Sequence, residues 1–207
     1  MANTKKSKMN LPNKLSMFRI FMVPVFLICF AVPLHKFGIS ENVMRIVTAV
    51  IFAITSLTDM IDGKIARKYN LITDFGKFID PLADKFLVFA ALLGILTNDY
   101  FAALRPYFIW AAAIIIFREL AVTSIRLVAA GKSGLVIAAS WLGKIKTVSQ
   151  MCGIVFILLE PVIFGDLTTV AGLPIISMVF IVIMTVMTLW SGIDYLKTYW
   201  GCLDPEK

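Results

Sequence analysis

Charged residues are scarce in this chain. Only 16% of its 207 residues are Asp, Glu, Lys or Arg, whereas 59% are hydrophobic. Soluble domains are usually about half apolar and about one quarter charged. The composition therefore excludes an ordinary soluble domain and indicates an integral membrane protein.

Histidine and cysteine are also nearly absent. The chain has one histidine and three widely separated cysteines, and no C-x-x-C pair occurs. Zinc sites and disulfide frameworks need clustered or paired ligands, so the sequence points to neither. No Ser-His or Cys-His arrangement for covalent catalysis is evident either.

Basic residues outnumber acidic ones and give a net charge of +7. No aromatic-basic groove or nucleic-acid motif accompanies this charge, so we expect no nucleic-acid partner. In a membrane protein, an excess of Lys and Arg faces the cytoplasm and anionic lipid head groups. The lipid bilayer is therefore the expected partner.

Six apolar segments are predicted to be transmembrane helices. Each has about 20 residues, which is enough to cross a hydrocarbon core of about 30 Å. They span residues 13–34, 43–65, 75–97, 106–128, 140–159 and 175–195. No repeat or low-complexity tract divides them, so we expect one all-α integral membrane domain over residues 1–207.

The distribution of basic residues predicts the orientation. Lys and Arg gather in the N-terminal region and in the second and fourth connections, whereas the fifth connection, residues 160–174, has two acids and neither Lys nor Arg. Cytoplasmic loops are the ones enriched in Lys and Arg, so both termini are predicted to be cytoplasmic. The basic juxtamembrane segment 1–12 is expected to form either an interfacial helix or a disordered tail.

Carboxylates gather in one stretch, "SLTDMIDGKIARKYNLITDFGKFIDPLADK", residues 56–85, which holds five of the thirteen acidic residues. Asp59 and Asp62 are three apart and Asp80 and Asp84 four apart, so each pair shares one face of a helix. If the two helices run antiparallel around a turn near Asn70, all four carboxylates lie at similar depth.

Four carboxylates close together in an apolar setting would repel one another strongly. Some must then be protonated, or a cation must lie between them. Ligand sets made only of Asp oxygens favour Mg²⁺, Mn²⁺ or Ca²⁺ over zinc. One or two such ions together with a phosphate ester fit this set better than a closed protein cage.

Small and basic residues accompany the carboxylates. Gly63 and Ala66 lie on the same side as the first pair, and Gly76 lies one turn before Asp80. Small residues allow helices to approach closely or leave room for a ligand. Arg67 has the forked geometry that binds a diphosphate. The alternative is that these are packing residues and a topology signal.

The same stretch matches a longer pattern. It reads Asp59-x₂-Asp62-Gly63-x₂-Ala66-Arg67-x₈-Gly76-x₃-Asp80-x₃-Asp84. This pattern resembles the signature of the CDP-alcohol phosphotransferase family, without departure. The words "LPNKLSMFRI", "FRELAVTSIR" and "AASWLGKIKT" resemble the bacterial branch of that family that makes phosphatidylglycerol phosphate, so the resemblance extends over residues 11–147.

The resemblance implies an activity. It is transfer of the phosphatidyl group from CDP-diacylglycerol to sn-glycerol 3-phosphate, giving phosphatidylglycerol phosphate and CMP. It also implies a homodimer in the bacterial cytoplasmic membrane, with the active site on the cytoplasmic side. Sister enzymes with another acceptor, of the cardiolipin synthase or phosphatidylinositol phosphate synthase type, stay open. An Asp-based ion or solute transporter is a more distant alternative.

The resemblance also assigns roles to residues. Asp59, Asp62 and Asp80 would hold two Mg²⁺ or Mn²⁺ ions, and Asp84 would lie near the metals and act as the general base. The site for CDP-diacylglycerol would comprise Asp59, Asp62, Gly63, Ala66, Arg67 and Gly76. Asn13 in "LPNK" is expected either to contact the nucleotide or to cap the first helix.

A phosphate-bearing acceptor needs basic partners. Arg118 and Arg126 are eight residues apart and share a face of one helix, and Glu119 is a candidate partner for the first of them. Lys144 and Lys146 begin the next helix from the same side. We predict that Arg118, Arg126, Lys144 and Lys146 form the glycerol-3-phosphate pocket. The alternative is that they only mark the cytoplasmic side.

Overall fold

The computed structural model describes residues 10–31, 38–69, 73–133 and 140–200, without the side chains of 59–60, 62–64, 66–68, 74–75, 77–78 and 129–133. Six long helices account for most of these residues. They are α1 (Leu11–Ala31), α2 (Glu41–Lys68), α3 (Asp74–Thr97), α4 (Arg105–Ser133), α5 (Trp141–Ile163) and α6 (Ile175–Tyr199). Two short 3₁₀ turns, η2 (Asp99–Phe101) and η3 (Gly165–Thr168), precede α4 and a small hairpin.

Five of the helices are long and apolar enough to cross a membrane, namely α1, α2, α4, α5 and α6. Helix α3 is outside this group, because every stretch of 18 residues in it contains Asp80, Asp84 and Lys85. Ionisable side chains inside a span are costly and are usually functional. The predicted all-α membrane fold is confirmed at this level, whereas the sixth span and the orientation stay predictions.

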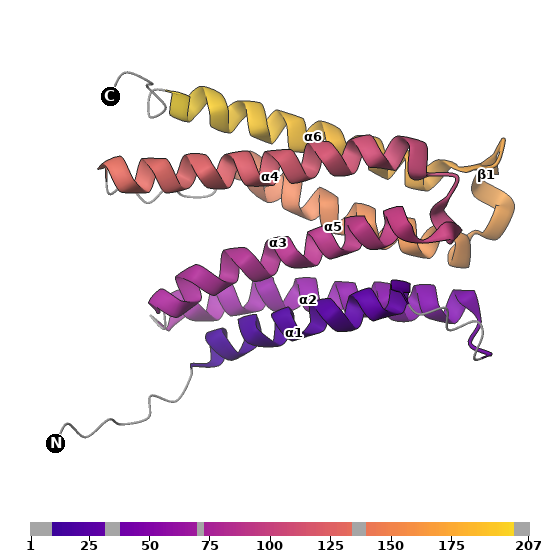
Figure 1. Ribbon diagram of the computed structural model, residues 1–207, viewed down its shortest axis with the longest axis horizontal. Helices are drawn as coiled ribbons and strands as arrows, with labels where there is room; N and C mark the ends of the chain where they lie inside the picture. The colour runs from indigo at the N-terminus through magenta and orange to yellow at the C-terminus, as the bar shows by residue number, and fades with distance from the viewer. Residues whose placement is uncertain (1–9, 32–37, 70–72, 134–139, 201–207) are drawn as a thin grey trace.

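The helices run alternately up and down the bundle (Figure 1). The start of α1, the end of α2, the start of α3, the end of α4, the start of α5 and the end of α6 lie at one end of it (Figure 1). Helix α3 packs chiefly on α1, and α6 packs on both α4 and α5. The helix ends that flank the connections assigned to the cytoplasm therefore share one end of the bundle.

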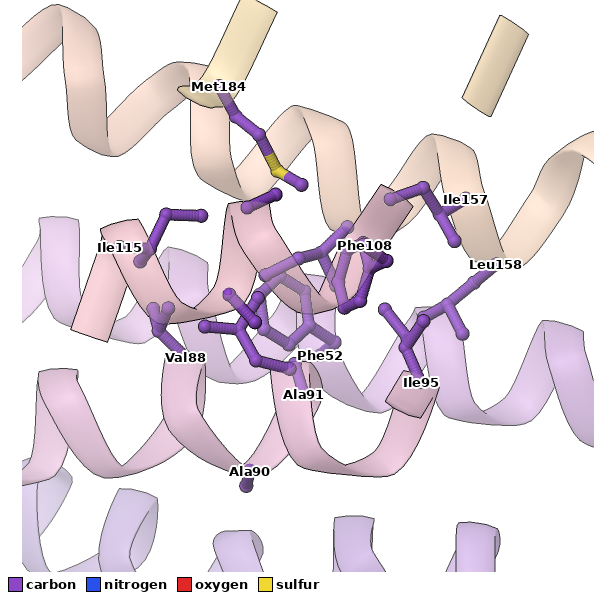
Figure 2. Packing of buried hydrophobic residues seen from close by; sticks show 14 of the residues in the cluster. Phe52, Val88, Ala90, Ala91, Ile95, Phe108, Ile115, Ile157, Leu158 and Met184 are labelled. Atoms are coloured by element: carbon purple, nitrogen blue, oxygen red, sulfur yellow. The ribbon is translucent and has the colours of Figure 1, made fainter. Parts of the chain in front are cut away.

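The core is a continuous apolar cluster. Phe52, Ala91, Phe108, Ile157 and Met184 come from five different helices, and each has no exposed surface. Figure 2 shows them within one layer between the helices. Lipid is as apolar as these side chains, so close packing rather than exclusion from water holds the helices together.

Close approach between α1 and α3 depends on a glycine. A Cβ atom on Gly94 would lie 2.5 Å from the ring of Phe30. A larger residue at this position would therefore displace the Phe30 ring of α1. The contact holds α1 against the helix that carries Asp80 and Asp84.

The fifth connection folds into a hairpin that the sequence analysis did not predict. Strands β1 (Thr169–Val170) and β2 (Leu173–Pro174) pair antiparallel. Ala171 and Gly172 between them have φ angles of 52° and 80°. Two positive φ angles are what a two-residue type I′ turn requires.

Glu160 links this connection to the start of α6 by hydrogen bonds. The side chain is 1% exposed, and its two oxygens accept hydrogen bonds from Thr168 Oγ1 (2.7 Å), Ile176 N (3.1 Å), Ser177 N (2.5 Å) and Ser177 Oγ (2.5 Å). Pro174 at the N-cap of α6 provides no side-chain cap. Glu160 therefore supplies the negative charge and the acceptors that the first turn of a helix needs.

Replacing Glu160 by Gln should destabilise the protein by about 2–3 kcal/mol, because the new amide faces hydrogen-bond donors and leaves them unpaired. Thermal unfolding in detergent measures this as a lowered Tm. Asp166→Asn, an exposed acid in η3, is the matched control and should leave the Tm unchanged. Equal Tm values for the two variants would contradict this role of Glu160.

Candidate active site

A cavity of about 620 Å³ opens between α3, α4 and α5. Its ionisable lining residues are Asp80, Asp84 and Lys85 from α3, Arg118, Glu119 and Arg126 from α4, and Lys144 and Lys146 from α5. The structure thus brings two of the predicted metal-binding carboxylates into one space with all four residues of the predicted phosphate pocket. These two groups were predicted from separate parts of the sequence.

Helix α1 contacts Asp80, one of the two carboxylates of α3 that line the cavity. The hydroxyl of Ser16, which is completely buried, donates a hydrogen bond of 2.5 Å to Oδ1 of Asp80. This contact fixes one oxygen of the carboxylate at the edge of the cavity. The sequence analysis missed Ser16, although it lies three residues after Asn13 and therefore on the same face of α1.

Asn13 lies against the start of α3. Its Nδ2 donates to Thr73 Oγ1 (2.9 Å), and the Thr73 hydroxyl donates back to its Oδ1 (3.1 Å). Thr73 also caps α3 by accepting from Gly76 N (3.0 Å). Helix α1 begins at Leu11, so the alternative that Asn13 caps its own helix is wrong, and contact with a nucleotide stays a prediction.

Gly76 lies within this network. A Cβ atom there would come 2.9 Å from Asn13 Oδ1 and 3.7 Å from Oδ2 of Asp80. The absence of a side chain therefore leaves room for Asn13 and keeps the approach to Asp80 open. This is the room for a ligand or for close packing that the sequence analysis expected.

The other predicted site residues are in α2. Asp59, Asp62, Gly63, Ala66 and Arg67 belong to the helix, but their side chains lie outside the described residues. Within the described residues, no group of three or more His, Cys, Asp or Glu lies close enough to hold a metal ion. The meeting of all four carboxylates therefore stays a prediction.

Two of the basic residues that line the cavity are buried and form ion pairs with one carboxylate. Arg118 is 8% exposed and Lys146 is 5% exposed. Both contact the same oxygen of Glu119: Arg118 Nη1 lies 3.2 Å from it, and Lys146 Nζ forms the second ion pair. The expected pairing of Arg118 with Glu119 is confirmed, and the pairing with Lys146 is new.

Two residues of helix α6 accept hydrogen bonds from Arg118 and Arg126. Arg118 Nη2 donates to Ser191 Oγ (2.5 Å), and Arg126 Nη2 donates to the hydroxyl of Tyr195 (2.5 Å). Ser191 and Tyr195 do not line the cavity themselves. They were not predicted from the sequence, although their spacing of four residues places them on one face of a largely apolar helix.

The charges of the cavity favour an anion. Of the side chains that the structure describes, five cationic and three acidic ones line it, which gives these residues a surplus of two positive charges. The Nε atoms of Arg118 and Arg126 are buried without a hydrogen-bond partner among the described residues. Arg45 and Arg105, which lie away from the cavity, also have buried Nε atoms without a partner among the described residues. An unpaired Nε atom is therefore evidence for anion binding only where it accompanies the cavity. Together, the surplus charge and the free donors suit a phosphate group.

Glu119 should be more important for stability than any one of its partners. Glu119→Gln removes the carboxylate with which both buried cations, Arg118 and Lys146, are paired, and breaking a buried ion pair in this way costs about 3–5 kcal/mol. We expect the Tm to fall by about 5–15 °C. The double variant Glu119→Gln/Lys146→Met removes one stranded cation and should regain part of the loss. A double variant less stable than Glu119→Gln would contradict this account.

The chain is similar to a known family and to individual proteins over most of its length. A model of the CDP-alcohol phosphatidyltransferase family matches residues 9–191. The chain is 41% identical over 200 residues to the CDP-diacylglycerol–glycerol-3-phosphate 3-phosphatidyltransferase of Bacillus subtilis, covering 94% of this chain and 97% of that protein. A Salmonella paratyphi A protein of the same name is 34% identical over 196 residues, with the same coverage of both chains.

A third relative is a probable phosphatidylglycerophosphate synthase of Mycobacterium tuberculosis. It is 38% identical over 188 residues, which are 90% of this chain and 80% of that protein. The similarity therefore extends over nearly the whole chain and includes every helix that lines the cavity.

Proposed function

The chain belongs to the CDP-alcohol phosphatidyltransferase family, and we propose that it transfers the phosphatidyl group of CDP-diacylglycerol to sn-glycerol 3-phosphate, giving phosphatidylglycerol phosphate and CMP. Three relatives with names of this activity support the proposal. The observation that carries it is the cavity, in which Asp80 and Asp84 share one space with five basic residues. Both substrates are phosphate esters, and the acceptor is a dianion.

The predicted divalent cations fit the described part of the site. Asp80 and Asp84 offer carboxylate oxygens one turn apart on α3, and Ser16 engages Oδ1 of Asp80, which leaves Oδ2 for a ligand. An all-oxygen donor set suits Mg²⁺ or Mn²⁺. Asp59 and Asp62 would complete the set. When bound, the ions would neutralise charge on the diphosphate of the donor.

Asp84 is the proposed general base. Its carboxylate accepts the proton of the acceptor's 1-hydroxyl, and that oxygen forms a bond to the lipid-side phosphorus of CDP-diacylglycerol. The bond from this phosphorus to the bridging oxygen breaks, and CMP leaves with that electron pair. Arg118, Arg126, Lys144 and Lys146 bind the acceptor's own phosphate and hold its hydroxyl toward Asp84.

The donor is a lipid, and the site has an apolar neighbour. A cavity of about 300 Å³ between α2 and α5 shares Val148 and Met151 with the active-site cavity, and its lining is apolar apart from Ser56 and Cys152. We place acyl chains there and the head group in the charged cavity. The cytoplasmic side of the bacterial cell membrane is the proposed location of the site, and a homodimer is the proposed assembly.

The acceptor distinguishes this function from its alternatives. Purified protein with CDP-diacylglycerol and Mg²⁺ should release CMP only when sn-glycerol 3-phosphate is added, and not with inositol 1-phosphate or phosphatidylglycerol. Asp84→Asn should lower kcat by at least about 10²-fold, which is the contribution typical of a general base. Ser124→Ala, on the exposed side of α4, is the control and should retain full activity.

Each other result has a defined meaning. Release with a different acceptor would keep the family and overturn the proposed acceptor. Full activity of Asp84→Asn would overturn the role of Asp84. No CMP release with any acceptor would overturn the transferase reaction and favour the transporter.

A further inference from the structure

Tyr195 contacts both arginines of the proposed acceptor pocket. Its side chain is 1% exposed and belongs to α6, not to a helix that lines the cavity. The guanidinium carbon of Arg126 lies 5.0 Å from the centre of the Tyr195 ring, and that of Arg118 lies 5.5 Å from it. Both distances are within the range of cation–π attraction.

The hydroxyl of Tyr195 makes a second set of contacts. It accepts hydrogen bonds from Arg126 Nη2 (2.5 Å) and from the backbone N of Ser140 (3.0 Å). Ser140 is the N-cap of α5 and accepts from Gly143 N through its own hydroxyl (3.1 Å). One side chain therefore connects α6 with Arg126 on α4 and with the first turn of α5.

The other two basic residues of the proposed acceptor pocket lie near the start of α5. Lys144 and Lys146 follow Ser140 within two turns and line the cavity. The residue that fixes Ser140 thus also limits where these lysines lie. Long cationic side chains have many rotamers, and holding them in place before the ligand arrives increases affinity.

We propose that Tyr195 is a positioning residue for the acceptor's phosphate. It holds the guanidinium groups of Arg118 and Arg126 by its ring, and it fixes Arg126 and the start of α5 by its hydroxyl. It acts through these residues and does not touch the substrate. This inference rests on the proposed function, because it assigns the phosphate of sn-glycerol 3-phosphate to that pocket.

The test separates the ring from the hydroxyl. Tyr195→Phe keeps the ring that contacts the arginines and removes both hydrogen bonds. We expect the KM for sn-glycerol 3-phosphate to rise about tenfold, since hydrogen bonds to charged groups are stronger than neutral ones. The KM for CDP-diacylglycerol and the kcat at saturating acceptor should stay within about twofold. Tyr199→Phe, one turn further along α6, is the matched control and should change neither KM.

A double variant tests whether Tyr195 acts through Arg126. Tyr195→Phe should raise the acceptor KM by clearly less than its tenfold single effect when it is added to Arg126→Ala, because one of the two donors to the hydroxyl is already gone and only the bond from Ser140 N remains to be lost. Full additivity of the two changes would overturn the inference. An unchanged acceptor KM in Tyr195→Phe, or equal rises of both KM values, would also overturn it.

The wild-type measurement separates this inference from the proposed function. If wild-type protein does not require sn-glycerol 3-phosphate for CMP release, the proposed function fails. If wild-type protein requires it and Tyr195→Phe keeps the wild-type KM, only the role of Tyr195 fails.

Discussion

Charged groups inside an apolar bundle need partners, and the architecture of this protein follows from that requirement. In the part of the chain that the structure describes, eight ionisable side chains line one cavity between α3, α4 and α5. A membrane-embedded helix gains nothing from such residues unless they are paired or bind a ligand. Glu119 meets part of the requirement by contacting both Arg118 and Lys146. Among the described lining residues a surplus of positive charge remains, which a phosphate ester would neutralise.

Two helices that contribute no ionisable group to the cavity keep its walls in place. Helix α1 does so through Ser16 and Asn13, which hold Asp80 and the N-cap of α3. Helix α6 does so through Ser191 and Tyr195, which hold Arg118 and Arg126. At the far end of the bundle, Glu160 fixes the start of α6 to the hairpin. Three of the charged side chains of the site, Asp80, Arg118 and Arg126, are thus each oriented by a neutral polar residue from a neighbouring helix.

Much of this organisation is visible in the sequence. Apolar runs predicted the helices to within about five residues of their ends, the Asp pattern predicted the family, and both are confirmed. Residue spacing and basic connections predicted that Arg118, Arg126, Lys144 and Lys146 share one end with Asp80 and Asp84, and the cavity contains all six. Their chemical roles stay predictions.

The supporting residues were not predictable in the same way. Ser16, Ser191 and Tyr195 are neutral polar residues in largely apolar helices, and a helical spacing does not tell which neighbouring helix they face. The hairpin was missed because two strands of two residues give no alternating pattern. Glu160 was assigned to a connection, whereas it lies inside α5, where its carboxylate reaches the next helix.

The central claim is that the basic residues of the cavity, Arg118, Arg126, Lys144 and Lys146, bind the acceptor and not the donor. Steady-state kinetics of Arg118→Ala with both substrates tests it most directly, with Arg105→Ala at the opposite end of α4 as control. The account predicts that the KM for sn-glycerol 3-phosphate rises at least about tenfold in Arg118→Ala, that the KM for CDP-diacylglycerol stays within about twofold, and that the control changes neither. Equal rises of both KM values would contradict it.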